Sequence, residues 1–168
     1  MPSVLPQYIE PKRLAAAGDV LTGKIDQVEM PRLTSLVSSS DSEVSFSLVF
    51  CEGAQGEIQI TGNLKTTLTM QCQRCLSEMK FILDNPISIS VIKNGNEVEL
   101  INSDFEPILV NEEKIILLDL IEDEVILGLP IAPLHSQDAC SVKGQSNHHF
   151  VKKENPFAEL SKLKSSKT

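Results

Sequence analysis

The sequence predicts an α+β fold, mainly an antiparallel twisted sheet or a partly open barrel, with a few short helices and a flexible C-terminal tail. Apolar and polar residues alternate over three long stretches, 44–51, 58–72 and 79–91, with the period of half-buried strands. Turn sequences separate these stretches, so consecutive strands are expected to pair as hairpins. The pattern changes to a helical period only over 117–128, which predicts one amphipathic helix.

The first part of the chain predicts two short helical segments around one strand. Pro11 suits the first position of a helix and Gly18 suits its C-terminal stop, so a helix of about two turns is expected between them. A strand is expected over Val20–Val28. Pro31 then opens a helical turn that is expected to end near Val37.

The long alternating stretches predict the hairpins of the sheet. Gly62 interrupts the second stretch and is expected to mark a bulge or a bend. The sequence Cys-Gln-Arg-Cys at 72–75 separates the second and third stretches, which places the cysteine pair at a hairpin tip. The Asn-Gly pair at 94–95 favours a tight turn and predicts a further hairpin leading into a strand over 97–101.

The amphipathic helix has recognisable signals at both ends. Asp119 and Glu122 have the spacing of a capping box, which predicts that the helix starts there. Pro130 and Pro133 are expected to end it, because proline cannot continue a helix.

The length of 168 residues predicts one domain with tails, since a domain averages roughly 150 residues. We expect a single antiparallel-sheet-based domain over residues 1–140 and a polar, mobile tail over 141–168. The tail contains a short amphipathic segment, 156–163, which is expected to fold only when docked. Its apolar residues Phe157 and Leu160 are therefore candidate partner contacts.

Charge and composition restrict the classes of partner. The net charge of −8 repels phosphate backbones, and one Tyr with no Trp leaves little aromatic surface for stacking on bases, so a nucleic-acid role would be local or indirect. Residues 97–124 hold ten acidic residues against one lysine. This span, including Glu122, Asp123 and Glu124, can dock a basic partner such as a ribosomal protein, although solvated strand and helix faces are the preferred explanation of these charges.

The cellular compartment is predicted from what the sequence lacks. No apolar stretch has the length of a signal peptide or approaches the roughly 20 residues of a membrane span. We therefore expect a cytoplasmic protein without membrane contact, whose four cysteines are reduced.

The sharpest local motif is the pair Cys72 and Cys75, because two thiolates at this spacing can bind one tetrahedral zinc ion. His135 and Cys140 are the natural completing ligands, in a loop after the helix. Plain reduced thiols are an equal alternative, and a redox pair is disfavoured because strands rather than a helix N-terminus flank the motif. No cofactor is certain, and structural zinc is the candidate. Arg74, between the cysteines, can contact phosphate or a carboxylate, or be a solvated turn residue.

Catalytic motifs are missing from the sequence. It has no Gly-x-x-x-x-Gly-Lys phosphate loop, no His-Glu-x-x-His and no Gly-x-Ser-x-Gly elbow. We expect no enzymatic activity, no catalytic residues and no small-molecule substrate.

Taken in order, the motifs resemble the YceD family, the large ribosomal RNA subunit accumulation proteins of bacteria and plastids. The matching stretches are Pro-Lys-Arg-Leu at 11–14, Cys-Gln-Arg-Cys-Leu at 72–76, Phe-Glu-Pro-Ile at 105–108, Asp-Leu-Ile-Glu-Asp-Glu-Val-Ile-Leu at 119–127 with Leu-Pro at 129–130, the pair His135 and Cys140, and Asn-Pro-Phe-Ala at 155–158 with Leu160, Leu163 and Lys164. Some members of the family carry a fuller cysteine set near His135 and Cys140, which fits metal binding there.

The resemblance implies a non-enzymatic accessory role in the synthesis, processing or stability of 23S ribosomal RNA and in large-subunit biogenesis. The implied partners are a ribosomal protein, an assembly factor or precursor 23S rRNA. Two alternatives remain open: a zinc-dependent RNA-processing hydrolase, and a general protein-docking module unrelated to ribosomes.

Overall fold

The computed structural model describes residues 5–39, 41–54, 56–95, 101–110, 113–136 and 138–142. Within them the fold is α+β, as the sequence predicts. The elements, in chain order, are β1 (Tyr8–Ile9), α1 (Pro11–Ala17), β2 (Val20–Asp26), the 3-10 turn η1 (Gln27–Glu29), α2 (Pro31–Leu36), β3 (Glu43–Glu52), β4 (Ile58–Gln71), β5 (Glu78–Ile92), β6 (Glu106–Leu109), β7 (Ile115–Ile116) and α3 (Leu117–Leu127). None of the described helices has the length and apolar character needed to cross a lipid bilayer.

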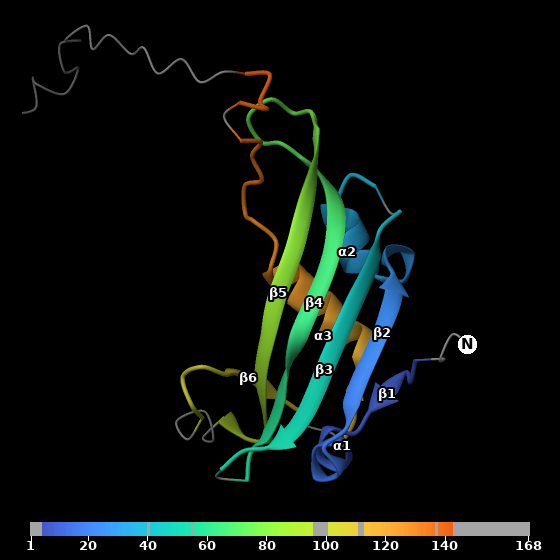
Figure 1. The fold of residues 1–168 in the computed structure, drawn as a ribbon, viewed down its shortest axis with the longest axis vertical. Coiled ribbons are helices and arrows are strands. Elements are labelled where there is room, and N and C mark those ends of the chain that lie inside the picture. The colour runs from blue at the N-terminus through green and yellow to red at the C-terminus, as the bar shows by residue number, and fades with distance from the viewer. Residues whose placement is uncertain are drawn as a thin grey trace, which may run out of the picture.

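The strands form one large sheet and one small one. The large sheet has the order β2-β3-β4-β5-β6, and the small sheet pairs β1 with β7. Neighbours are antiparallel from β2 to β5, whereas β6 runs parallel to β5. Figure 1 shows an open, twisted sheet with β4 and β5 as its longest strands. Of the two predicted architectures, the twisted sheet is therefore confirmed, and the sheet does not close into a barrel.

The three long strands match the predicted stretches to within about two residues, but the details around them differ. The β4 register runs without a skipped residue against both neighbours, so of the bulge or bend expected at Gly62 the bulge is excluded. Glycine is needed there for another reason, since a Cβ atom at Gly62 would lie 2.0 Å from the carbonyl oxygen of Ser47. The strand expected over Val20–Val28 ends earlier, at Asp26, and η1 begins at Gln27.

The predicted hairpin after β5 falls largely outside the described residues, which omit 96–100. Ile101 lies in a bend rather than in a strand. The next strand of the sheet is β6, which pairs with β5 in parallel through the register Ile89 with Glu106 to Ile92 with Leu109. A parallel pairing requires a crossover instead of a tight turn. The predicted tail, residues 141–168, also lies outside the described residues beyond 142.

Helix α3 lies across one face of the large sheet and supplies one side of the core (Figure 1). Its residues Ile121 and Val125 are completely buried, as are Leu64 and Leu68 of β4. Removing such apolar surface from water is the main force that holds a helix on a sheet, at about 25 cal/mol per Å². The phase of α3 about its axis is thereby fixed.

The start of α3 corrects the sequence prediction. The helix begins at Leu117 with Ile116 as its N-cap, not at Asp119, and no side chain caps it. Glu122 does not complete a capping box, because its side chain is 2% exposed and turned to another helix. A spacing of three residues is a local signal, and here a tertiary contact overrides it.

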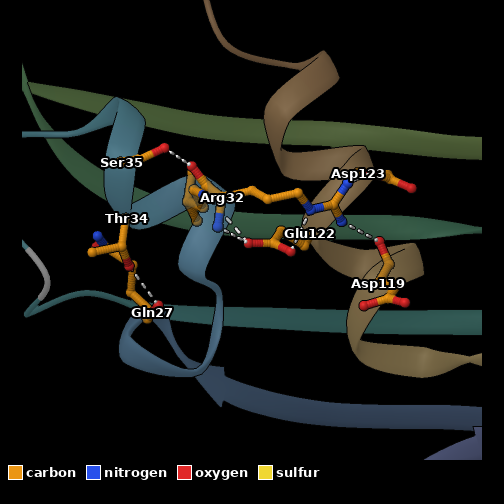
Figure 2. Close-up of polar contacts among 8 residues, drawn as sticks. Gln27, Arg32, Thr34, Ser35, Asp119, Glu122 and Asp123 are labelled. Atoms are coloured by element: carbon orange, nitrogen blue, oxygen red, sulfur yellow. Dashed lines mark hydrogen bonds and ion pairs between the residues drawn. The ribbon is translucent and has the colours of Figure 1, made fainter.

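The Glu122 carboxylate joins α3 to the N-terminus of α2 (Figure 2). One oxygen accepts hydrogen bonds from the backbone N–H of Arg32 at 2.8 Å and of Leu33 at 3.0 Å, and the other accepts from Arg32 Nε at 2.8 Å. The N-cap of α2 is Met30, whose side chain offers no acceptor for these free N–H groups. Glu122 therefore acts as the missing cap, while the Arg32 guanidinium also contacts Asp123.

We expect Glu122→Ala to destabilise the fold by about 2–4 kcal/mol, because it leaves two helix-end N–H groups and a guanidinium without their buried acceptor. Urea denaturation measures this change. Asp123→Ala is the matched control and should cost less than about 1 kcal/mol, since both side chains of the Arg32–Asp123 pair are half exposed. Equal losses in the two variants would contradict the capping role.

Candidate metal centre

The turn between β4 and β5 has a tightly bonded backbone. Cys72 follows β4 directly, its N–H donates to Ser77 O at 3.0 Å, and Leu76 N–H donates back to Cys72 O at 2.8 Å. Leu76 has a positive φ of 61°, which is uncommon for a residue with a branched side chain. The strands on both sides confirm the hairpin tip predicted for the cysteine pair and provide no helix N-terminus for a redox motif.

The loop after α3 folds back onto this tip. Gln73 N–H donates to Pro133 O at 2.9 Å, and His135 N–H approaches Cys72 Sγ at 3.4 Å. One turn further along, Cys140 N–H donates to Ser136 O at 3.1 Å, and Cys140 is buried. The two segments are 60 residues apart in the sequence and are held together at several points.

Four side chains converge where the segments meet: Cys72, Cys75, His135 and Cys140. Their ligand atoms all lie within 4.8 Å of one another. A tetrahedral zinc ion with Zn–S bonds of about 2.3 Å separates neighbouring ligand atoms by about 3.5–4 Å. The cluster of three cysteines and one histidine can therefore hold a metal ion after small adjustments.

The histidine ring has the orientation of a metal ligand. His135 Nδ1 lies 3.3 Å from Cys75 Sγ, and Nε2 lies 3.2 Å from the carbonyl oxygen of Glu78. A proton on Nε2 would make the bond to Glu78 and leave the Nδ1 lone pair facing the sulfur atoms. Metal-binding histidines commonly have such a carbonyl partner on their second nitrogen.

The surroundings of two of the thiols favour the thiolate that metals bind. Hydrogen bonds from the Ser77 hydroxyl and N–H lower the pKa of Cys75 to about 5. For Cys72, burial acts to raise the pKa, but the N–H groups of His135, Cys75 and Arg74 lower it to about 7. Both can thus be ionised at neutral pH before a cation arrives.

The other two ligands hold their protons more firmly. Burial raises the pKa of the Cys140 thiol. Hydrogen bonds to Cys72 and Cys75 raise the pKa of His135. A metal ion would displace these protons, because only the thiolate and the neutral imidazole coordinate it, so its affinity would fall as the pH is lowered.

The predicted partner contacts that fall on described residues do not gather on one surface. Arg74 is partly exposed at the hairpin tip. Glu122 is engaged with α2, Asp123 lies half exposed beside Arg32, and Glu124 is 9% exposed on another side of α3. Phe157 and Leu160 lie outside the described residues. Partner binding by these residues stays a prediction.

Sequence reasoning missed the residues that support the cluster. Ser77 polarises Cys75, the Glu78 carbonyl orients His135, and Leu76 adopts the turn conformation. The role of Ser77 could have been found from the sequence, because a serine stands two positions after the second cysteine. The roles of Glu78 and Leu76 have no such signal. Glu78 acts through its backbone carbonyl, and Leu76 adopts a conformation for which glycine would be expected.

Comparison of the sequence with known proteins places the chain in a family. Residues 60–164 match the model of the family described as large ribosomal RNA subunit accumulation protein YceD. The chain belongs to the YceD family. The curated relative of this name from Haemophilus influenzae is 30% identical over 167 residues, covering 95% of this chain and 96% of its own length. No solved structure matches the chain. The resemblance seen in the sequence is thus confirmed, and the matched residues include all four members of the cluster.

We expect the purified YceD-family chain to bind one Co²⁺ or Zn²⁺ per molecule, with the absorption of a tetrahedral, thiolate-ligated cobalt site. Chelation should lower the melting temperature by about 5 °C or more, because metal binding adds to the free energy of unfolding. Cys75→Ser should abolish both effects, whereas Cys51→Ser should abolish neither, since Cys51 lies outside the cluster. Stoichiometry well below one metal per chain would contradict the site.

Proposed function

We propose that this chain is a non-enzymatic accessory factor in the synthesis, processing or stability of 23S ribosomal RNA and in the biogenesis of the large ribosomal subunit. It acts in the cytoplasm by binding a ribosomal protein, an assembly factor or precursor rRNA. The observation that carries the proposal is membership of a family named for large ribosomal RNA subunit accumulation, supported by a 30% identical relative that spans nearly the whole chain.

Structural zinc at Cys72, Cys75, His135 and Cys140 is part of the proposal. The donor set of three thiolates and one imidazole suits zinc, which prefers sulfur and nitrogen ligands in a tetrahedron. These residues would fix the β4–β5 tip to the loop after α3. The tip and loop carry exposed apolar side chains, with Leu76 64% exposed and Leu134 and Val142 about half exposed. A rigid tip offers such side chains to a partner at a lower entropic cost.

The geometry argues against a zinc-dependent hydrolase. Catalytic zinc sites keep one position open for water, whereas four protein ligands fill the tetrahedron. Two of the four, Cys72 and Cys140, are also buried. The cluster therefore supports a structural role for the metal.

The proposal is tested by deleting the gene for this chain and measuring precursor and mature 23S rRNA together with ribosomal subunit profiles. We expect mature 23S rRNA and large subunits to fall relative to small subunits, and the wild-type chain to restore them. Cys75→Ser should restore them poorly if the metal site supports the active fold, and Cys51→Ser should restore them fully.

Unchanged 23S rRNA and unchanged subunit profiles in the deletion strain would overturn the proposal. A general docking module would give a different result. Its affinity-purified partners would be dominated by proteins that are not part of ribosomes or of their assembly, and rRNA levels would be normal.

A further inference from the structure

A pocket of about 410 Å³ lies beside the C-terminal end of α3, away from the metal centre. It is bordered by β5, by the start of β6 and by the last turn of α3. Asp104, Glu106 and Glu124 line it together with the apolar side chains of Pro86 and Leu127. No lysine or arginine is among its described lining residues.

Glu124 is an unpartnered charge in this pocket. It is 9% exposed, and it makes no side-chain hydrogen bond or ion pair with any residue that the structure describes. Its two neighbours in the sequence differ, since Glu122 and Asp123 both bind Arg32. Its carboxylate oxygens are not among the fully enclosed atoms that lack a partner, so they keep contact with water where they line the pocket. A carboxylate placed in this way gains when a cation supplies the missing partner.

Three influences act against the charged form of Glu124. Burial raises its pKa, and the negative charges of Glu106 and Asp123 raise it further. Glu124 also lies in the last turn of α3, where the negative end of the helix dipole disfavours an anion. A cation placed in the pocket would offset all three, because its positive charge favours the charged form of Glu124.

The geometry distinguishes an organic cation from a metal ion. Among the described residues, the cluster of Cys72, Cys75, His135 and Cys140 is the one whose ligand atoms converge closely enough to hold an ion. The pocket carboxylates do not converge in this way. The pocket is also far larger than a bare ion, and its walls of Pro86 and Leu127 suit the aliphatic part of a long side chain.

We propose that this pocket, called here the Glu124 pocket, binds an arginine side chain of a basic partner protein, with Glu124 as the ion-pair partner of the guanidinium. Arginine fits better than lysine for two reasons. Its guanidinium is weakly hydrated and enters a partly apolar site more readily, and its fork of donors can serve more than one carboxylate. The inference rests on the proposed function, because it names the chemistry by which that function's protein partner is recognised.

The test uses the full chain and a short peptide with one arginine, acetylated and amidated at its ends. Its controls are the same peptide with lysine or with citrulline, the neutral analogue of arginine. In an NMR titration, we expect the arginine peptide to shift the backbone amides of Ser88, Leu127 and Gly128. We expect the lysine peptide to bind more weakly and the citrulline peptide to leave these amides unshifted.

Glu124→Gln keeps the shape of the side chain and removes its charge. We expect arginine-peptide binding to fall at least about tenfold, because a buried ion pair loses one partner. The melting temperature should stay the same or rise, since the repulsion from Glu106 disappears. A purely structural role for Glu124 would instead lower the melting temperature. Glu29→Gln, at an exposed site on η1, removes the same charge and should leave peptide binding unchanged.

Equal binding of the arginine and citrulline peptides, or full binding by Glu124→Gln, would overturn the inference. Equal binding of the lysine peptide would overturn the assignment to arginine. Rescue of the deletion strain separates this inference from the proposed function. If the wild-type chain and Glu124→Gln both restore 23S rRNA fully, only the pocket fails. If the deletion leaves 23S rRNA unchanged, the proposed function fails, whatever the peptides do.

Discussion

The contact between the Glu122 carboxylate and the N-terminus of α2 ties α3 to α2, and it acts together with the buried apolar face of α3 that holds the helix on the sheet. Successive helical residues are rotated by about 100°, so directing Glu122 inward fixes where its neighbours point. Asp123 is then half exposed beside Arg32, and Glu124 faces the opposite flank next to β5 and β6. The same anchoring fixes the end of α3 and hence the loop that carries His135 to the β4–β5 tip. The buried Glu122 carboxylate is thus tied by the geometry of α3 to the placement of Glu124 in its pocket.

Local patterns in the sequence were sufficient for the parts of the fold that depend on local physics. Alternation located β3, β4 and β5 because each has one face on the core. Pro11 and Gly18 marked α1 because their backbone preferences fit its ends. The convergence of Cys72, Cys75, His135 and Cys140 was also predictable, because a hairpin tip and the loop after a helix can bring cysteine and histidine side chains together. Their binding of a metal stays a prediction.

Tertiary contacts determine the features of the fold that local sequence patterns could not predict. The pair of Asp119 and Glu122 fits a capping box, but Glu122 has a better partner in the uncapped N-terminus of α2, some 90 residues earlier in the chain. β6 has four residues, one of them Pro107, and pairs in parallel across a long connection, so neither alternation nor a turn motif announces it. In the sequence, Glu122, Asp123 and Glu124 are simply three adjacent acidic residues. Only the packing shows that the first caps a helix, the second forms a surface ion pair and the third is buried without a partner among the described residues.

The two sites differ in whether groups of this chain provide the partners that their polar side chains need. In the candidate metal centre the ligand atoms lie close to one another, and Ser77 and Glu78 hydrogen-bond Cys75 and His135, so groups of this chain supply the whole site except the ion. The Glu124 pocket is the reverse, because its carboxylates repel one another and gain only from something outside the described fold. An acidic chain with a net charge of −8 is poorly suited to hold RNA by its phosphates, but this charge favours encounter with basic proteins. Among the partners in the proposed function, this charge favours a protein over rRNA. The candidate metal centre would then supply rigidity and the Glu124 pocket would supply recognition.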